Sequence, residues 1–208
     1  MDETFEFKSC VNPNEKIKTT VERISVDDEQ YNIKIVKNVF SESEIDYLLK
    51  KELDDDGWMA SRVGDLHTSS HTKVDNHRIS RSAWLQEEHE DEIIACLKDR
   101  FVSLNNKQYL DKFHIEPLQL VKYDHVGSKY DEHFDSQDDE ILNQICKNKN
   151  HELFYSYCSP SGEPVRRDST MFVVMETTNL DKCGGETVFP NIIDSKSQMP
   201  LKIEPKRN

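Results

Sequence analysis

The sequence predicts an α+β fold in which helices back a β-sheet. One strand-like stretch and two amphipathic helical patterns occupy the first half of the 208 residues, and strand-like apolar runs dominate the second half. Helices and strands that are grouped along a chain, rather than alternating, are typical of this class. A chain of this length is long enough to form one domain with a substantial core.

The elements follow one another in a simple order. Residues 1–30 are polar and lack clear periodicity, so we predict a lead-in there and a single domain over residues 31–208. β-Branched residues favour a strand over residues 33–39. The remaining predictions are a helix over 41–53, a loop over 59–77, a helix over 87–102, a strand over 117–123, a loop over 136–166 and a strand over 170–175.

Both helices are predicted from local patterns. Ser41 and Glu44 have the spacing of a capping box, in which each side chain binds the other residue's backbone amide. Apolar residues then recur three and four positions apart, as they do on one face of a helix. A second apolar stripe marks the later helix, and it consists of Ile93, Ile94, Leu97 and Phe101.

Composition and charge narrow the classes of partner and compartment. Twenty-seven basic and 40 acidic residues give a formal net charge of −13, which disfavours binding to nucleic acid or to an anionic membrane. The apolar runs are too short to cross a bilayer, and the first residues do not resemble a signal peptide. The five cysteines form no Cys-x-x-Cys pair. We therefore expect free thiols and a cytoplasmic location, while the oligomeric state stays open.

The chemistry is concentrated after the predicted strand over residues 117–123. His133 and Asp135 are two positions apart, so on an extended chain both side chains face the same side. An imidazole and a carboxylate are two members of the facial triad that binds non-haem Fe(II). The three-residue pattern alone is short, and exposed loops also contain it.

The surrounding residues resemble the prolyl 4-hydroxylase branch of the Fe(II)/2-oxoglutarate-dependent dioxygenases. The similar segments appear in the order known from that family and span roughly residues 35–205. The most specific of them is Gly-Gly-Glu-Thr-Val-Phe-Pro, which comes after the His-x-Asp motif. The matching segments are residues 39–44, 77–85, 118–123, 127–135, 167–170 and 184–190.

This resemblance implies a double-stranded β-helix, or jelly roll, with supporting helices. It implies that His133 and Asp135 bind Fe(II), and that Tyr123, Tyr130 and Thr170 line the pocket for 2-oxoglutarate. The co-substrates would be 2-oxoglutarate and O2, with L-ascorbate as reductant. The substrate would be a proline-containing peptide or protein, which is hydroxylated while 2-oxoglutarate is converted to succinate. From the residues alone, the two tyrosines and the threonine are equally compatible with ordinary strand positions.

The sequence departs from the family pattern near its end. The resemblance calls for a distal His ligand and a Lys or Arg that binds the far carboxylate of 2-oxoglutarate. The last histidine, His151, follows His133 by only 18 residues and precedes the strand predicted to contain Thr170. We therefore expect a jelly roll that lacks its last strands, and a 208-residue chain that is C-terminally incomplete and inactive by itself.

Two alternatives to a prolyl hydroxylase remain open. One is a catalytically inactive relative that binds peptides, and the other is a hydroxylase of a different substrate, because a fold and its iron ligands do not define the substrate. Within the segment over residues 59–82, Arg78 and Arg81 are candidates for contacts with a peptide backbone or are simply solvated. His67, His71 and His77 match no metal-binding motif.

Overall fold

The computed structural model describes residues 3–54, 57–64, 72–85, 91–105, 115–135, 139–151, 157–177 and 184–207. The chain divides into two compact units. Unit 1 comprises Met1–Tyr130 and Val173–Asn208, and unit 2 comprises Asp131–Phe172. None of the helices in the described ranges is long enough and apolar enough to span a lipid bilayer.

The secondary structure is a mixture of helices and antiparallel sheets, as predicted. Every strand pair in the described part of the chain is antiparallel. The arrangement of these strands into a jelly roll stays a prediction. The helices are α1 (Glu42–Asp54), α2 (Glu92–Asn105) and α3 (Asp139–Lys147). The strands are β1 (Glu3–Lys8), β2 (Lys16–Val26), β3 (Glu29–Lys37), β4 (Met59–Ala60), β5 (Val63–Gly64), β6 (Thr72–Lys73), β7 (Arg78–Ile79), β8 (Arg81–Trp84), β9 (Gln119–Lys122), β10 (Lys129–Tyr130), β11 (Thr187–Ile193) and β12 (Pro200–Ile203).

The N-terminal residues form a sheet, so the predicted lead-in over residues 1–30 is wrong. Strands β1, β2 and β3 pair in sequence order. In β2, the side chains of Ile17, Thr19 and Val21 are buried, whereas the side chains that alternate with them are exposed or half-buried. This period of two is the pattern of a half-buried strand, and charged neighbours obscure it in the sequence. A turn at Asp27 and Asp28, both at positive φ, joins β2 to β3.

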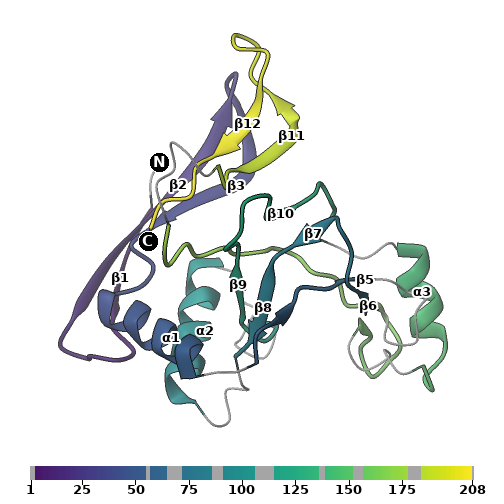
Figure 1. The fold of residues 1–208 in the computed structure, drawn as a ribbon, viewed down its shortest axis with the longest axis horizontal. Helices are drawn as coiled ribbons and strands as arrows, with labels where there is room; N and C mark the ends of the chain where they lie inside the picture. The colour runs from purple at the N-terminus through teal and green to yellow at the C-terminus, as the bar shows by residue number, and fades with distance from the viewer. Residues whose placement is uncertain are drawn as a thin grey trace. The chain divides into compact units, whose positions relative to one another are not determined.

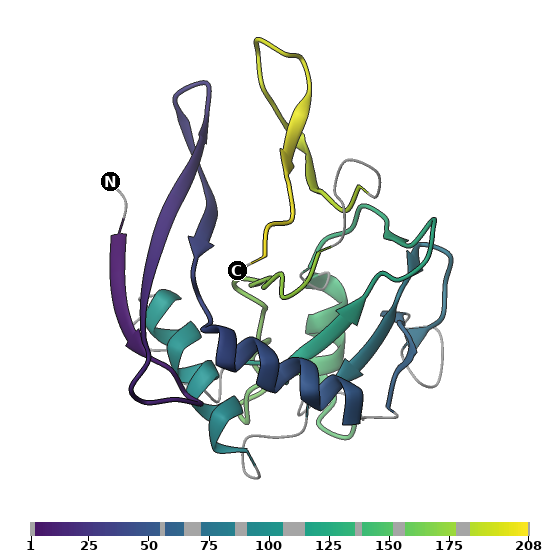
Figure 2. The ribbon, with the colours of Figure 1, turned by 60° about the vertical axis from the view of Figure 1, so that its left-hand side comes forward.

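Helix α1 begins at the predicted capping box. The Ser41 amide donates to Glu44 Oε2 at 2.8 Å, and the Glu44 amide donates to Ser41 Oγ at 3.3 Å. Asp91 performs the capping role for α2, because its Oδ1 accepts hydrogen bonds from the amides of Ile93 and Ile94. The two helices lie side by side near the base of the β2–β3 hairpin (Figures 1 and 2).

The apolar faces of these helices form the core of unit 1, together with residues from β2, β9 and the segments that flank the helices. The predicted stripe on α2 is confirmed, since Ile94, Leu97 and Phe101 are buried there. The buried cluster consists of Val21, Val39, Phe40, Ile45, Leu48, Leu85, Ile94, Leu97, Phe101, Leu104 and Leu120.

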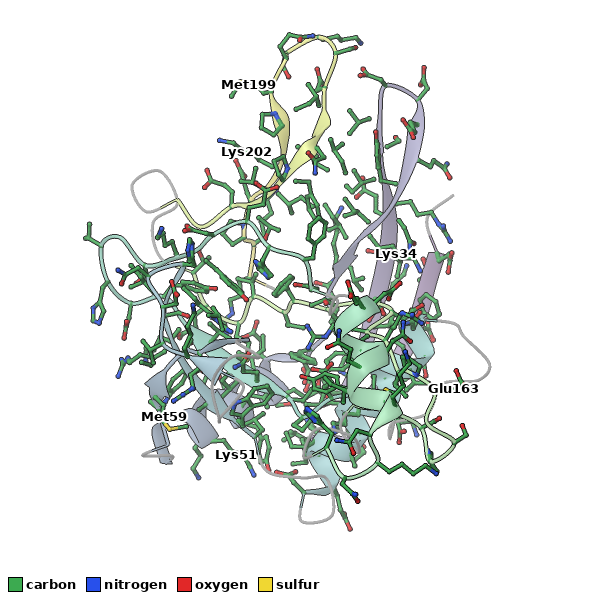
Figure 3. The ribbon with its side chains drawn as sticks, turned by 90° about the vertical axis from the view of Figure 1, so that its right-hand side faces the viewer. Lys34, Lys51, Met59, Glu163, Met199 and Lys202 are labelled. Atoms are coloured by element: carbon green, nitrogen blue, oxygen red, sulfur yellow. A yellow bond between two sulfur atoms is a disulfide. The ribbon has the colours of Figure 1, made fainter. Side chains whose placement is uncertain are left out.

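Short strands complete unit 1. The strand predicted over residues 117–123 is confirmed as β9, which pairs with β8, and β8 also pairs with β4. The predicted loop over residues 59–77 contains β4, β5 and β6, while residues 65–71 lie outside the described part. Strands β11 and β12 form a separate hairpin (Figure 1) whose connection includes the exposed Met199 (Figure 3).

Two predictions of secondary structure for the rest of the chain are wrong. The predicted loop over residues 136–166 contains α3, which has acidic residues in its first turn and buries Leu142 and Ile145, three positions apart. The strand predicted over residues 170–175 is not formed.

The cysteines were also predicted wrongly. Four of them form the disulfides Cys10–Cys96 and Cys146–Cys158, with Cα–Cα distances of 5.8 and 5.6 Å. Cys183 lies outside the described residues. Widely spaced cysteines carry no signal for pairing in the sequence, because only the fold brings them together.

Candidate metal site

The side chains of His133 and Asp135 converge within unit 2. His133 Nε2 lies 3.0 Å from Asp135 Oδ1, and both side chains are about one-third exposed, at 35% and 39%. The prediction placed both residues at the end of one strand, but β10 ends three residues earlier, at Tyr130. A bent segment over residues 131–135 brings the two side chains together instead.

The tautomer of His133 follows from its second contact. His133 Nδ1 lies 2.8 Å from the backbone carbonyl oxygen of Asp131, which can only accept a hydrogen bond, so Nδ1 bears the proton. In a neutral imidazole, Nε2 then directs a lone pair at the Asp135 carboxylate. Two acceptors at 3.0 Å repel each other unless a proton or a cation lies between them. Histidines that bind metals typically have their other ring N–H fixed by a carbonyl or carboxylate in this way.

The distance between His133 Nε2 and Asp135 Oδ1 also fits two ligands of one metal ion. Two adjacent ligands of an octahedral ion, each about 2.1 Å from it, are about 3.0 Å apart. Among the described residues, no group of three or more His, Cys, Asp or Glu side chains is placed to hold one ion. The described residues therefore offer two candidate protein ligands, and the remaining positions of an ion bound there would be open to small molecules.

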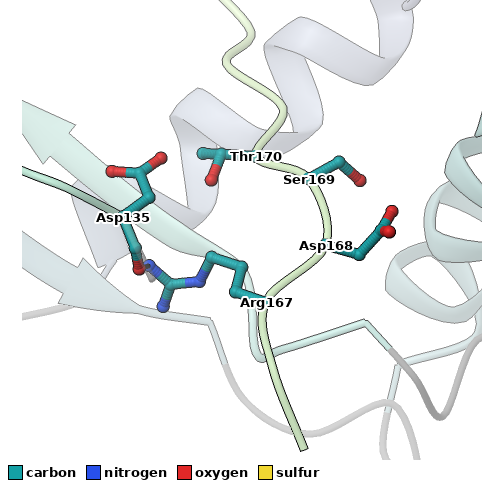
Figure 4. A pocket seen from close by; sticks show the side chains of 5 residues that line it. All are labelled: Asp135, Arg167, Asp168, Ser169 and Thr170. Carbon is teal, nitrogen blue, oxygen red and sulfur yellow. Dashed lines mark hydrogen bonds between the residues drawn. The ribbon is translucent and has the colours of Figure 1, made fainter. Parts of the chain in front are cut away.

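An open pocket of about 260 Å³ adjoins this pair in unit 2, and its lining includes Asp135 and Thr170. Figure 4 shows the Thr170 side chain turned toward the Asp135 carboxylate, whereas the side chains of Asp168 and Ser169 turn away from it. The structure thus brings together three of the five predicted site residues, His133, Asp135 and Thr170.

Arg167 belongs to the same pocket, although no residue pattern predicts its role there. Its Nη1 donates a hydrogen bond to the backbone oxygen of Asp135 at 2.9 Å. The guanidinium therefore helps to fix the backbone of a candidate ligand. The segment over residues 167–170 is one of those that resemble the family pattern, but side-chain-to-backbone contacts of this kind have no sequence signature.

The predicted tyrosines lie in unit 1, where they form a second cluster. Tyr130 of β10 is paired with Arg78 of β7, and the Arg78 guanidinium carbon lies 4.6 Å from the centre of the Tyr130 ring. Tyr123 follows β9 and is 51% exposed overall. Desolvation of its hydroxyl raises the pKa of Tyr123, although the charge of Arg78 and a hydrogen bond with Ser80 oppose this shift. The phenol is consequently protonated at neutral pH.

Two hydrogen bonds hold the guanidinium of Arg78 in this cluster. Its Nη1 donates to the backbone oxygen of Arg62 at 3.2 Å, and its Nη2 donates to Gln119 Oε1 at 3.4 Å. The buried Nε has no hydrogen-bond partner in the described part of the chain. Arg81, the other candidate for a contact with substrate, instead pairs with Asp124. Of the three histidines in this region, His67 and His71 lie outside the described residues, and His77 is exposed beside Asp75.

The predicted site residues therefore fall into two groups, one in each unit. Unit 2 holds the candidate ligands His133 and Asp135 with Thr170, and unit 1 holds the two tyrosines with Arg78 and Ser80. Comparison of the chain with protein-family models, with curated proteins and with solved structures gave no match.

Proposed function

We propose that this chain is an Fe(II)/2-oxoglutarate-dependent dioxygenase of the prolyl 4-hydroxylase type. The observation that best supports the proposal is the His133–Asp135 pair, whose facing donor atoms lie 3.0 Å apart while the other nitrogen of His133 is held by a backbone carbonyl. This arrangement suits a divalent cation in a site with open positions. When bound, iron together with 2-oxoglutarate and O2 would supply the oxidising chemistry that hydroxylates a prolyl residue and releases succinate and CO2, with L-ascorbate as reductant.

The residues around the pair have roles that fit this reaction. In unit 2, the Thr170 hydroxyl is a donor for a carboxylate oxygen in the pocket that Asp135 also lines. In unit 1, the protonated Tyr123 and the cationic Arg78 are donors for a carboxylate or a peptide carbonyl. Each unit thus supplies polar groups that would orient a substrate or co-substrate. The oxidising chemistry itself would come from the bound iron with 2-oxoglutarate and O2.

A catalytically inactive relative that binds peptides is the second candidate. It is favoured by the absence, within the described residues, of a third His, Cys, Asp or Glu beside the pair. In that case Arg78 and the exposed Trp84 would still provide peptide contacts, but the chain would bind iron weakly or not at all. Turnover assays separate the two candidates.

The two disulfides change the compartment that we propose. Disulfides persist in oxidising compartments and are rare in the cytosol. We infer from Cys10–Cys96 and Cys146–Cys158 that this domain works in an oxidising environment, in place of the cytoplasmic location predicted from the sequence. Alkylation of free thiols in the native protein, before and after reduction, tests this directly.

Metal binding is the first test of the function. Binding of Co(II) or anaerobic Fe(II), measured by calorimetry, is expected to be weakened about tenfold or more by His133→Gln, since a ligand is lost. The chain offers a matched control in His125, whose Nε2 lies 3.2 Å from the carboxylate of Asp124. His125→Gln is expected to leave binding unchanged. Equal effects of the two substitutions would exclude the proposed site.

Turnover is the second test. The longest native chain that contains these residues is incubated with Fe(II), 2-oxoglutarate, ascorbate and proline-containing peptides, and succinate and hydroxyproline are measured together. Equal amounts of both products, lost in His133→Gln, would support the hydroxylase. Metal or peptide binding without succinate would favour the inactive relative. Succinate without hydroxyproline would indicate another substrate.

A further inference from the structure

Bonds between two sequence segments hold the metal-binding part of unit 2 together. The first segment contains the ligand pair and α3, and the second runs from residue 157 to the pocket residues 167–170. The bonds pair early residues of one segment with late residues of the other, as in a hairpin. They are Asp135–Arg167, Asp139–Arg166 and the disulfide Cys146–Cys158.

The two polar bonds in this series are exposed and individually weak. Arg166 Nε lies 2.7 Å from Asp139 Oδ1, but the two side chains are 50% and 71% exposed. Surface ion pairs of this kind contribute little because solvent screens them. The Arg167 contact with the Asp135 backbone is also at the surface. Among the described bonds between these segments, the disulfide is the covalent one.

Apolar packing in unit 2 is also limited. The buried side chains in its described part are those of Leu142, Ile145, Cys146 and Cys158. The two cysteines are thus half of this small core. A chain segment with so little apolar burial depends on a crosslink to offset the entropy lost on ordering.

The disulfide is also directly connected to the pocket along the chain. Cys158 forms a β-bridge with Pro164, and the Val165 amide donates to the Tyr157 carbonyl at 2.7 Å, so residues 157–165 form a tight reversal. The residues that follow this reversal are Arg166 and Arg167. The position of Cys158 therefore fixes where the pocket segment begins.

We propose that oxidation of Cys146 and Cys158 assembles the metal site, so that the disulfide is a positioning element for His133, Asp135 and Thr170. This inference rests on the proposed function, because it concerns the affinity of the same site. In the step itself, the two thiols lose two protons and two electrons to an external disulfide donor, which is reduced to a dithiol. The Sγ–Sγ bond that forms is buried, so the site stays assembled after the step.

The test compares two double-serine variants of the full chain. Cys146→Ser with Cys158→Ser removes the proposed positioning crosslink, and Cys10→Ser with Cys96→Ser removes the disulfide of unit 1 as a matched control. Co(II) affinity is measured by calorimetry, and amide hydrogen exchange is followed over residues 131–135 and 167–170. Circular dichroism establishes that each variant is folded.

The first variant is expected to bind Co(II) about tenfold or more weakly than wild type and to exchange faster in both segments. The control is expected to match wild type in both measurements over these segments. Unchanged affinity and exchange in the first variant would overturn the proposal. If wild type binds no Co(II), the metal-site proposal fails, and the exchange data alone then decide whether the crosslink orders the pocket.

A variant that does not fold calls for a second measurement. Wild type is then equilibrated in glutathione buffers of graded potential, and alkylation with mass spectrometry gives the reduced fraction of each cysteine. Exchange over residues 131–135 and 167–170 is expected to rise with the reduced fraction of Cys146. Exchange that follows the reduced fraction of Cys10 instead would overturn the proposal.

Discussion

Arg100→Met is expected to destabilise unit 1 strongly, because it breaks a fully buried ion pair. The side chains of Arg100 and Glu44 are 2% and 0% exposed, and their closest nitrogen–oxygen distance is 2.6 Å. The guanidinium also donates to the backbone oxygens of Val39 and Lys8, at 2.7 and 3.0 Å. Methionine fills a similar volume but donates no hydrogen bond, so the Glu44 carboxylate and the two backbone carbonyls lose the hydrogen bonds that Arg100 donates to them.

The magnitude follows from these contacts. Removing one partner of a buried ion pair typically costs about 3–5 kcal/mol, because the other charge stays desolvated. Glu44 retains the amides of Cys10 and Ser41, at 2.6 and 2.8 Å, which reduces the loss. A double variant that adds Glu44→Gln removes the uncompensated charge. We therefore expect the double variant to be less destabilised than the sum of the two single variants by about 2–3 kcal/mol.

Urea denaturation of wild type, both single variants and the double variant measures this coupling. The slope of the unfolding free energy against urea must stay constant across the four proteins for the comparison to be valid. Free energies that add within about 0.5 kcal/mol would show that the two residues do not interact. A loss below about 1 kcal/mol in Arg100→Met would likewise refute the argument from burial.

Two further predictions concern the helix starts. Burial disfavours the charge of Glu44, but hydrogen bonds from Arg100 and two backbone amides outweigh this effect and lower the pKa of Glu44. A carboxyl group whose pKa is lowered by folding stabilises the folded state at pH values above the ordinary glutamate pKa of about 4.3. This stabilisation is lost as the pH falls through the folded-state pKa. Acid titration should therefore destabilise wild type more steeply than Glu44→Gln, and parallel curves would contradict this. Asp91→Ala removes the cap of α2 and the ion pair with Lys51, at a cost of about 1–2 kcal/mol; an unchanged Tm would exclude the capping role.

Local patterns were sufficient to predict the parts of the fold that depend on neighbouring residues. The capping box of Ser41 and Glu44 and the apolar stripe of α2 act within a few residues, so the sequence contains them in full. The same reasoning could have found α3, where Leu142 and Ile145 have helical spacing. It could also have found β1, in which Phe5 and Phe7 alternate with exposed polar residues.

Other features depend on the path of the backbone, which no local residue pattern specifies. The sequence predicted from the His-x-Asp spacing that the two side chains would share a side, and they do converge. It could not show that the Asp131 carbonyl fixes the tautomer of His133, since a backbone bend makes that contact. Likewise, the pairing of Cys146 with Cys158 depends on where α3 ends and where the following reversal begins.

The proposed metal site depends on these contacts. Unit 1 is held by a large apolar cluster and a buried ion pair, so its stability does not depend on any single bond near the tyrosines. Unit 2 buries few described side chains, and the segments of its candidate site are connected by a disulfide and two arginine contacts, while His133 contacts a backbone carbonyl. Weakly packed segments hold ligands well only when such bonds fix their geometry, because a misplacement of about 1 Å can cost about 100-fold in activity. It follows that substitutions at the crosslinks of unit 2 should affect metal binding more than global stability, whereas substitutions in the core of unit 1 should do the reverse.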